Sequence, residues 1–433
     1  MSTSRRIRAA AAQVSDAAFQ LPESCEFPQL RDMARGDQLA RGIATALARG
    51  KRRAPTLLHC AIRKLHYRPG SGCRLVIEAR FAGDGEGVEQ LYFGRLLTGD
   101  GAQRQFEASR RSALTPPRFG PPILFLPEWD LVLWAYPNDP GLPGLALLSD
   151  LRRVRERLAA SPGDFGLEQP PQAVRARRVK YVPGKRCGYV YSIVGSAGHW
   201  RGTRGLRIYG KCYAEGEAAR AHDVALRFWR SPARIGGRFL LPRPYACDEE
   251  AGIVWQEAFA GRPLLKQRGR TALARGGAFE IGARLAALHA TDVDLEEQMT
   301  LGFQVEMLRR SIEASRSLPA RHARAARELG NHLITMSRRL AELPPATLHG
   351  SFRLSHVMAS REGLAFIDLD GANRGDPSCD IGHFVAHVLR QGATASMSDS
   401  AASRLARSFH ALSRVTEPAT RGGRMSQASA VVS

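Results

Sequence analysis

The sequence lacks paired cysteines, long hydrophobic runs and a balancing number of acidic residues. Its 433 residues include only seven cysteines, an odd number spread along the chain without any Cys-x-x-Cys pair. This usage argues against a disulfide framework and a zinc site, and it is typical of a protein in a reducing cytoplasm. No segment approaches the roughly 18 uninterrupted hydrophobic residues of a membrane span, and no hydrophobic stretch follows the basic N-terminus. A cytoplasmic protein without a membrane partner is therefore expected.

The shortage of acidic residues leaves a formal net charge of +22, from 63 Lys and Arg against 41 Asp and Glu. Such an excess can indicate nucleic-acid binding. No aromatic-interleaved basic strand and no paired Cys/His cluster accompanies the charge, so nucleic acid is not the favoured partner. A basic surface around an anionic nucleotide site explains the charge more simply. The length predicts two or three domains, and 44% hydrophobic with 24% charged residues is typical of a globular protein.

A short internal repeat relates residues 63–73 to residues 177–187. The matching positions in the two copies are Tyr67, Pro69, Gly70 and Cys73 in the first and Tyr181, Pro183, Gly184 and Cys187 in the second. Shortly afterwards, residues 92–95 match residues 208–211. Each copy is expected to form a β-hairpin that turns at Pro-Gly and is followed by a third strand. We interpret the repeat as a duplication; the alternative is a chance resemblance between two Pro-Gly hairpins.

The second copy begins a β-rich region that gives way to helices. Hydrophobic periodicity predicts a helix over about 216–229, and residues 240–244 and 252–257 have the composition of strands. Residues 260–264 break the pattern as a hinge does. A mainly helical region follows the hinge, and within it a loop at 345–355 leads to two short strands and then to a helix over about 377–390.

Polar residues with a regular spacing follow these last strands. Asp368 ends a hydrophobic strand, where its carboxylate would be a suitable ligand for Mg²⁺. Asp370 could ligate a second Mg²⁺, act as a base, or cap the turn before Gly371. Asp376 followed by Pro377 is a good helix start, with the aspartate as N-cap and the proline in the first turn.

The full pattern of this region, with the order of β-rich lobe, hinge and helical lobe, resembles the aminoglycoside phosphotransferase and choline kinase group of the protein-kinase-like fold. The resemblance covers about residues 175–410. The matching residues are His349, Gly350, Asp368, Asp370, Gly375, Asp376, Pro377 and Asp380. In that family the loop reads His-Gly-Asp, four residues, then Asn. Here Ser351 stands at the Asp position and His356 at the Asn position.

The resemblance implies an α+β, two-lobed protein-kinase-like fold, and the repeat adds an N-terminal β-rich domain that resembles a duplicated N-lobe. The expected order is an N-terminal segment (1–55), the N-lobe-like repeat domain (56–165), the β-rich N-lobe (166–260), the helical C-lobe (261–414) and a disordered tail (415–433).

The resemblance also implies that the γ-phosphate of ATP or GTP, bound with Mg²⁺, is transferred to a hydroxyl of a small molecule. Lys211 is then the phosphate-binding lysine, and its acidic partner on the next helix is Asp223, with Glu217 as the second choice. The turn that would cover the phosphates contributes Gly184, Lys185 and Arg186.

Catalytic roles follow from the same resemblance. His349, Ser351 and Asp370 are the catalytic candidates, and Asp368 and His356 are the candidate metal ligands. A serine hydroxyl is not a base at neutral pH, and imidazole nitrogen is a poor ligand for Mg²⁺. The alternative for these side chains is a transition-metal triad of His349, His356 and Asp368.

These replacements leave a second function open, namely a catalytically silent nucleotide-binding module that regulates a protein partner through its N-terminal copy. Nucleotidyl transfer is a third, weaker alternative. In the first copy Arg95 stands where the second has Lys211, and an arginine does not simply replace the point charge of a lysine. An aminoglycoside acceptor is not favoured, because residues 309–339 are more basic than acidic.

Overall fold

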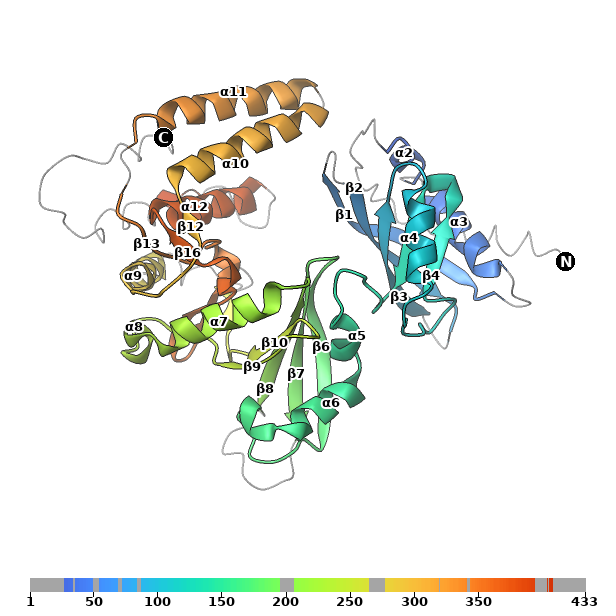
Figure 1. Cartoon of the computed structure of the whole chain (residues 1–433), viewed down its shortest axis with the longest axis horizontal. Coiled ribbons are helices and arrows are strands. Elements are labelled where there is room, and N and C mark those ends of the chain that lie inside the picture. Colours follow the sequence, from blue (N-terminus) through green and yellow to red (C-terminus); the bar gives the residue numbers. More distant parts are fainter. Residues whose placement is uncertain are drawn as a thin grey trace, which may run out of the picture.

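The chain folds into two antiparallel sheets and a mainly helical lobe. The computed structural model describes residues 27–33, 36–49, 54–68, 72–83, 87–194, 206–264, 277–318, 320–340, 343–393, 403 and 405–407. In Figure 1 the first sheet lies at the right, the second lies below the centre, and the helical lobe lies at the left. This confirms the predicted α+β architecture with an additional N-terminal β-rich domain.

The first sheet contains five strands in the order β1-β2-β3-β5-β4. The strands are β1 (Leu57–Arg68), β2 (Gly72–Phe81), β3 (Val88–Leu96), β4 (Ile123–Leu126) and β5 (Leu131–Ala135). Three helices accompany them, namely α2 (Leu30–Met33), α3 (Gly36–Ala48) and α4 (Gly101–Ser109). One face of the sheet forms a hydrophobic core with α2 and α3.

The second sheet repeats this arrangement, with five strands in the order β6-β7-β8-β10-β9. Its strands are β6 (Ala173–Val182), β7 (Arg186–Val194), β8 (Arg207–Tyr213), β9 (Pro244–Asp248) and β10 (Ile253–Glu257). Helices α5 (Leu145–Ser149) and α6 (Leu151–Ala160) precede it, and α7 (Glu217–Arg230) and α8 (Pro232–Ile235) follow β8. Helix α7 buries the periodic residues Ala218, Ala221, Val224 and Phe228, which explains why this segment is helical.

The strand registers show which residues of the two sheets are equivalent. Tyr67 lies opposite Cys73 and Tyr181 lies opposite Cys187. Residues 72–96 then pair as residues 186–213 do, so that Arg95 of β3 takes the position of Lys211 in β8. Pro69 and Gly70, which also belong to the repeat, lie outside the described residues. The same strand order and the same register favour duplication over a chance resemblance of two hairpins.

The helical lobe follows the second sheet. Its helices are α9 (Ala278–His289), α10 (Leu301–Ala314), α11 (Ala320–Ser337) and α12 (Ser378–Ala393). Its short strands are β11 (Arg262–Pro263), β12 (Gln298–Met299), β13 (Ala346–Leu348), β14 (Val357–Ser360), β15 (Gly363–Phe366) and β16 (Asn373–Gly375). Helices α10 and α11 pack side by side as a pair that stands away from the second sheet (Figure 1).

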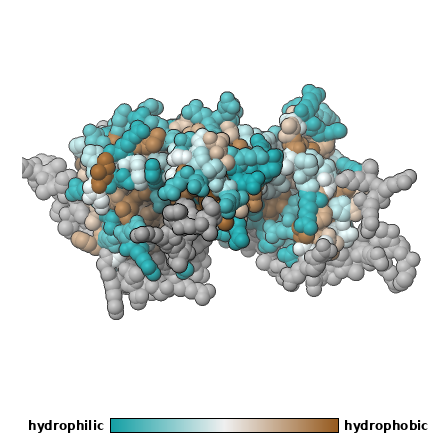
Figure 2. Space-filling model, turned by 90° about the horizontal axis from the view of Figure 1, so that it is seen from below, coloured by the Kyte–Doolittle hydropathy of each residue, from teal (hydrophilic) through white to brown (hydrophobic). Residues whose placement is uncertain are grey.

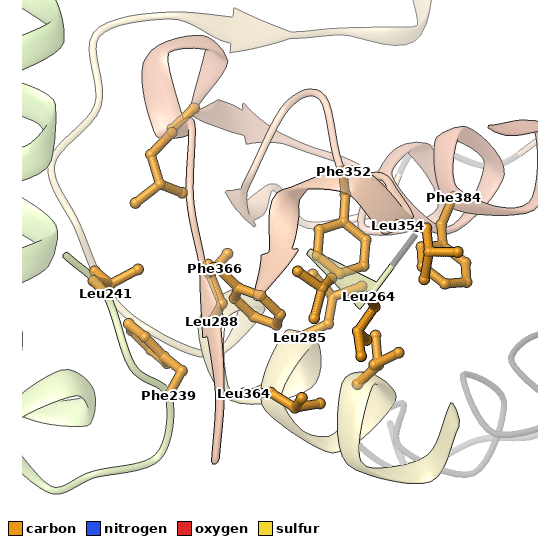
Figure 3. Packing of buried hydrophobic residues seen from close by; sticks show 14 of the residues in the cluster. Phe239, Leu241, Leu264, Leu285, Leu288, Phe352, Leu354, Leu364, Phe366 and Phe384 are labelled. Carbon is orange, nitrogen blue, oxygen red and sulfur yellow. The ribbon is translucent and has the colours of Figure 1, made fainter. Parts of the chain in front are cut away.

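A hydrophobic cluster holds the loop that begins at His349 (Figure 3). Phe352 of that loop packs against Phe366 of β15 and Phe384 of α12, at ring-centroid distances of 5.1 and 5.4 Å. The backbone N–H of Phe366 donates to the carbonyl of Leu240, which joins β15 to the segment before β9. The end of β15, where Asp368 follows, is therefore held by both lobes.

Two boundaries differ from those expected. The strand predicted at 240–244 begins only at Pro244, because Leu240 makes a single bridge to β15 instead of joining the sheet. The helix over about 377–390 runs from Ser378 to Ala393, and the Asp376 carboxylate accepts from the Ser378 N–H as an N-cap does. The predicted tail (415–433) and most of the N-terminal segment (1–55) lie outside the described residues.

Neither the described helices nor the surface coloured in Figure 2 shows a long hydrophobic region. None of the helices in the described ranges combines the length and hydrophobicity needed to cross a membrane. The face drawn in Figure 2 is mainly hydrophilic where it is coloured, with hydrophobic residues in small areas between hydrophilic ones.

Candidate functional site

A cleft with a volume of about 1420 Å³ lies between the second sheet and the helical lobe. Its basic lining residues are Arg177, Lys180, Arg186, Arg207, Lys211, Arg262 and Arg361, and its acidic ones are Glu257, Asp368 and Asp370. The excess of positive charge, concentrated in a concave surface, suits an anionic ligand.

Lys211 forms the centre of the cleft's ionic network. Its side chain is buried, and its Nζ donates to Oδ1 of Asp368 at 2.6 Å and also to Oδ2 of Asp370. The hydroxyl of Tyr213 donates to the other oxygen of Asp370 at 3.0 Å. Burial lowers the pKa of Lys211, but Tyr213 and the two carboxylates outweigh this effect and raise the pKa well above its usual value. The lysine is therefore a fixed cation.

Asp368 occupies an unusual backbone position at the end of β15. Its φ of 67° is left-handed, a conformation that costs free energy for any residue other than glycine and often occurs at functional sites. Its Oδ2 lies 3.2 Å from Nε2 of His356, and Nη1 of Arg186 lies 3.6 Å from Oδ1. Burial raises the pKa of Asp368, but the positive charges of Lys211 and Arg186 reverse this and lower it below its usual value. The carboxylate thus stays ionised.

The loop that begins at His349 is held by a buried carboxylate. Asp380 of α12 accepts from the backbone N–H groups of His349 at 2.7 Å and Gly350 at 3.0 Å. Gly350 has φ = 74°, and a Cβ at this position would lie 1.7 Å from the carbonyl oxygen of Gly371. Only glycine therefore allows the loop to pack against the turn that follows Asp368.

Ser351 and His356 stand at the two positions where the family pattern has Asp and Asn. The Ser351 side chain is partly exposed and lies beside Gly371: a Cβ added to Gly371 would be 3.9 Å from Cβ of Ser351. His356 is buried, its Nε2 accepts from Nε of Arg353 at 2.7 Å, and its Nδ1 has no hydrogen-bond partner among the described residues. Burial lowers the pKa of His356 to about 2, so that the imidazole is neutral.

The expected pair of Lys211 and Asp223 is not formed. Asp223 binds Arg227 on the same helix at 2.7 Å and is exposed, whereas the residues of α7 that line the cleft are Ala221 and Ala225. Because a helix turns about 100° per residue, Asp223 lies on a different face from these two alanines. The second choice, Glu217, is also exposed. In place of a helix carboxylate, Lys211 binds two aspartates of the other lobe.

The structure separates the three turn residues that were expected to cover the phosphates. Arg186 lines the cleft, but Gly184 and Lys185 do not. The N–H of Gly184 donates to the carboxylate of Asp139 at 2.8 Å, on the side of the first sheet, so it is not directed at the cleft. Sequence reasoning could not find this partner, since Asp139 lies 45 residues upstream in a connecting segment.

A divalent cation bound with phosphate groups fits Asp368 and Asp370, because Mg²⁺ uses one or two carboxylates together with water and phosphate oxygens. The described residues contain no group of three or more His, Cys, Asp and Glu side chains that could hold a metal by themselves. The alternative triad of His349, His356 and Asp368 is accordingly not assembled. Nε2 of His349 is instead hydrogen-bonded to the carbonyl of Ile367 at 3.1 Å.

Three further residues of the site were not expected from the sequence. Tyr213 binds Asp370, Arg353 binds His356, and Lys180 lines the cleft. Burial and the neighbouring Arg186 lower the pKa of Lys180. The position of Arg353 in the loop that begins at His349 was the one signal that could have identified it.

The chain was compared with known families and structures. The phosphotransferase enzyme family matches residues 194–415, just over half of the chain. The chain belongs to this family. None of the curated proteins matches the sequence.

Solved structures of phosphotransferases show a similar but distant arrangement. An aminoglycoside phosphotransferase from Streptomyces rimosus, also solved in complex with ADP and streptomycin, has 21% identity over 62% of this chain and 96% of its own, with a TM-score of 0.39. A choline/ethanolamine kinase family protein from Mesorhizobium loti has 16% identity over 60% of this chain and 76% of its own, with a TM-score of 0.40. The part matched by the phosphotransferase family begins at the end of β7, so the first sheet lies outside it.

Proposed function

We propose that the chain is a phosphotransferase that moves the γ-phosphoryl group of ATP or GTP to a hydroxyl of a small molecule. One observation carries the proposal: buried Lys211 bridges Asp368 and Asp370 within a basic cleft. Membership of the phosphotransferase family supports it. In such reactions the protein mainly positions the phosphates and neutralises their charge, which these side chains are suited to do.

Each residue then has a definite task. Lys211 and Arg186 bind the phosphate oxygens, and Asp368 and Asp370 hold Mg²⁺. When it is bound, Mg²⁺ neutralises the phosphate charge and aligns the phosphates. Neutral His356 anchors Arg353, whose guanidinium is then available to an anionic group. The Ser351 hydroxyl orients the acceptor by a hydrogen bond but does not take its proton.

The lack of a base at Ser351 lowers the rate without abolishing the reaction. A positioned general base contributes about 10²–10⁴-fold to a reaction rate. Positioning and charge neutralisation carry most of phosphoryl transfer, so the cleft retains the larger part of the catalytic effect. We therefore expect slow but nucleotide-specific transfer.

A catalytically silent nucleotide-binding module is the second candidate. It is favoured by three departures from the family pattern: Ser351, His356 and the alanines that α7 directs to the cleft. In that case the first sheet would engage a protein partner and the cleft would report nucleotide to it. Such a partner and a cytoplasmic location remain predictions from the sequence.

Release and transfer of the γ-phosphate from labelled ATP with Mg²⁺ separates the two candidates. Wild type should exceed Asp368→Ala by at least about tenfold, because the variant lacks the carboxylate that holds the cation and pairs with Lys211. Asp223→Ala is the matched control, since this carboxylate is exposed and does not contact Lys211. If wild type and Asp368→Ala are equally inactive while wild type still binds nucleotide, the silent module is correct and the enzyme is not.

A further inference from the structure

The hairpin turn between β6 and β7 is held by residues from outside the second sheet. Asp139, in the segment that connects the two sheets, is buried, and its Oδ2 accepts from the N–H of Gly184 at 2.8 Å and from the hydroxyl of Tyr181 at 2.9 Å. Its Oδ1 accepts from the N–H of Gly141 at 3.0 Å. One carboxylate therefore joins the connecting segment to both sides of the turn.

The first sheet completes this contact. Nζ of Lys64 in β1 donates to the carbonyl of Tyr181 at 3.0 Å. Nη1 of Arg74 in β2 lies 3.2 Å from the point where a Cβ on Gly184 would be, and a Cβ on Gly141 would lie 2.7 Å from Cα of Gly184. We call Lys64, Arg74, Asp139 and Gly141 the turn socket. The turn fits the socket so closely that a side chain on Gly141 or Gly184 would displace the neighbouring atoms.

The turn in the socket is directly connected to the ionic network of the cleft. The N–H of Lys185 donates to the carbonyl of Val182, which closes the turn, and Arg186 is the first residue of β7. Nη1 of Arg186 lies 3.6 Å from Oδ1 of Asp368 and 3.6 Å from Oδ2 of Asp370. A displacement of the turn would therefore displace the cation that contacts both carboxylates.

Among the residues that the structure describes, the first sheet has no ionic cluster comparable to that around Lys211. Arg95, at the position equivalent to Lys211, donates to the side-chain oxygen of Gln105 in α4 at 2.9 Å. Burial lowers the pKa of Arg95, and no carboxylate forms an ion pair with it among the described residues. The core of the second sheet instead includes Val76 of β2, so the two sheets are packed together. The first copy is thus arranged to hold the second copy rather than to bind a nucleotide.

We propose that the first sheet positions the hairpin turn between β6 and β7, and through it Arg186 of the cleft, by means of the turn socket, with Asp139 as the main positioning residue. This rests on the proposed nucleotide binding in the cleft. Because the first sheet and the turn both lie outside the part matched by the phosphotransferase family, the socket is a feature of this chain's additional domain.

Amide hydrogen exchange of the full chain without nucleotide tests the socket by itself. In Asp139→Ala the amides of Val182 and of residues 184–186 should exchange about tenfold faster or more, since the Gly184 N–H loses its acceptor and the turn its anchor. Asp139→Asn keeps one acceptor oxygen and should show a smaller increase. Glu78→Gln is the matched control, because it removes a buried carboxylate of the first sheet whose hydrogen bonds go to Arg63. Unchanged exchange in Asp139→Ala overturns the proposal.

Affinity for Mg·ATP then tests the consequence. If the released turn holds the binding geometry about one tenth of the time, the dissociation constant rises about tenfold in Asp139→Ala. It should stay unchanged in Glu78→Gln. Tighter binding in Asp139→Ala, or equal weakening in both variants, contradicts a positioning role. Should Asp139→Ala not fold, Lys64→Ala must show the same direction of change in both measurements. If wild type binds no nucleotide, the proposed function fails, while hydrogen exchange still decides the socket.

Discussion

Nζ of Lys211 lies 2.6 Å from Oδ1 of Asp368, so that a lysine of the second sheet and an aspartate of the helical lobe form an ion pair across the cleft. The lysine is buried, and the side chain of Asp368 is only 16% exposed. Because both side chains are largely withdrawn from water, such a pair is stronger than at the surface, and an unpaired partner is costly. The pair therefore joins the two lobes and keeps a cation and a carboxylate together at the site.

Removal of the lysine should destabilise the fold. Lys211→Met leaves Asp368 and Asp370 close together without their main cation, and the loss should be about 3 kcal/mol. Urea unfolding measures it. Because the harm comes from the remaining charge, the double variant Lys211→Met with Asp368→Asn should be more stable than Lys211→Met alone. Strictly additive losses would show that the two residues are not coupled.

Restoring a carboxylate at position 351 should raise phosphoryl transfer. Ser351→Asp provides a proton acceptor in the loop that His349 begins, and we expect an increase of about 10–10²-fold in kcat. A steady-state assay with the same nucleotide and acceptor measures the change. Ser311→Asp is the control, since it adds the same charge at an exposed position of α10 that does not line the cleft. If Ser351→Asp gives no increase in kcat, the missing carboxylate at position 351 does not limit the reaction, and the site serves another function.

Sequence reasoning located the site well but not the partners of its residues. The strand-end lysine and the spacing from His349 to Asp380 made Lys211 and Asp368 candidates, and the structure brings these two residues, far apart in the chain, into contact. Asp223 failed because a position one or two residues away on a helix changes the face to which a side chain points. The contact between Gly184 and Asp139 depends on how two sheets pack, which no local pattern records.

The duplication shows the same limit. The residues of the repeat predicted two similar hairpins, and the strand order and register of the first and second sheets agree with this. They did not predict that one copy would hold the turn of the other. That arrangement follows from buried groups such as Val76 and Asp139, whose partners lie in the other copy.

Asp380, which anchors the loop that begins at His349, should make the free energy of unfolding depend on pH. Burial raises the pKa of Asp380, but the hydrogen bond from His289 and the contacts with His349 reverse this and lower it. A carboxyl group whose folded-state pKa lies below the unfolded-state value of about 3.9 stabilises the fold above that pH, and the contribution is lost as the pH falls through the folded-state pKa.

Asp380→Asn should therefore lower the free energy of unfolding at neutral pH by about 2–4 kcal/mol, because two buried backbone N–H groups lose a charged acceptor. The variant should also lose less stability than wild type between about pH 5 and pH 2. Urea unfolding across this range measures both effects. Asp223→Asn, at an exposed carboxylate, should change neither. Equal pH dependence in wild type and Asp380→Asn would contradict the assignment.

Calorimetric titration with Mg·ATP, comparing wild type with Asp368→Ala, tests the central claim most directly. Wild type should bind one nucleotide with a dissociation constant between about 1 μM and 1 mM, the usual range for enzyme substrates. Asp368→Ala should bind at least about tenfold more weakly in the presence of Mg²⁺, because the carboxylate that holds the cation is gone. Absence of binding to wild type, or equal affinity in the two proteins, would contradict the assignment of the cleft as a nucleotide site.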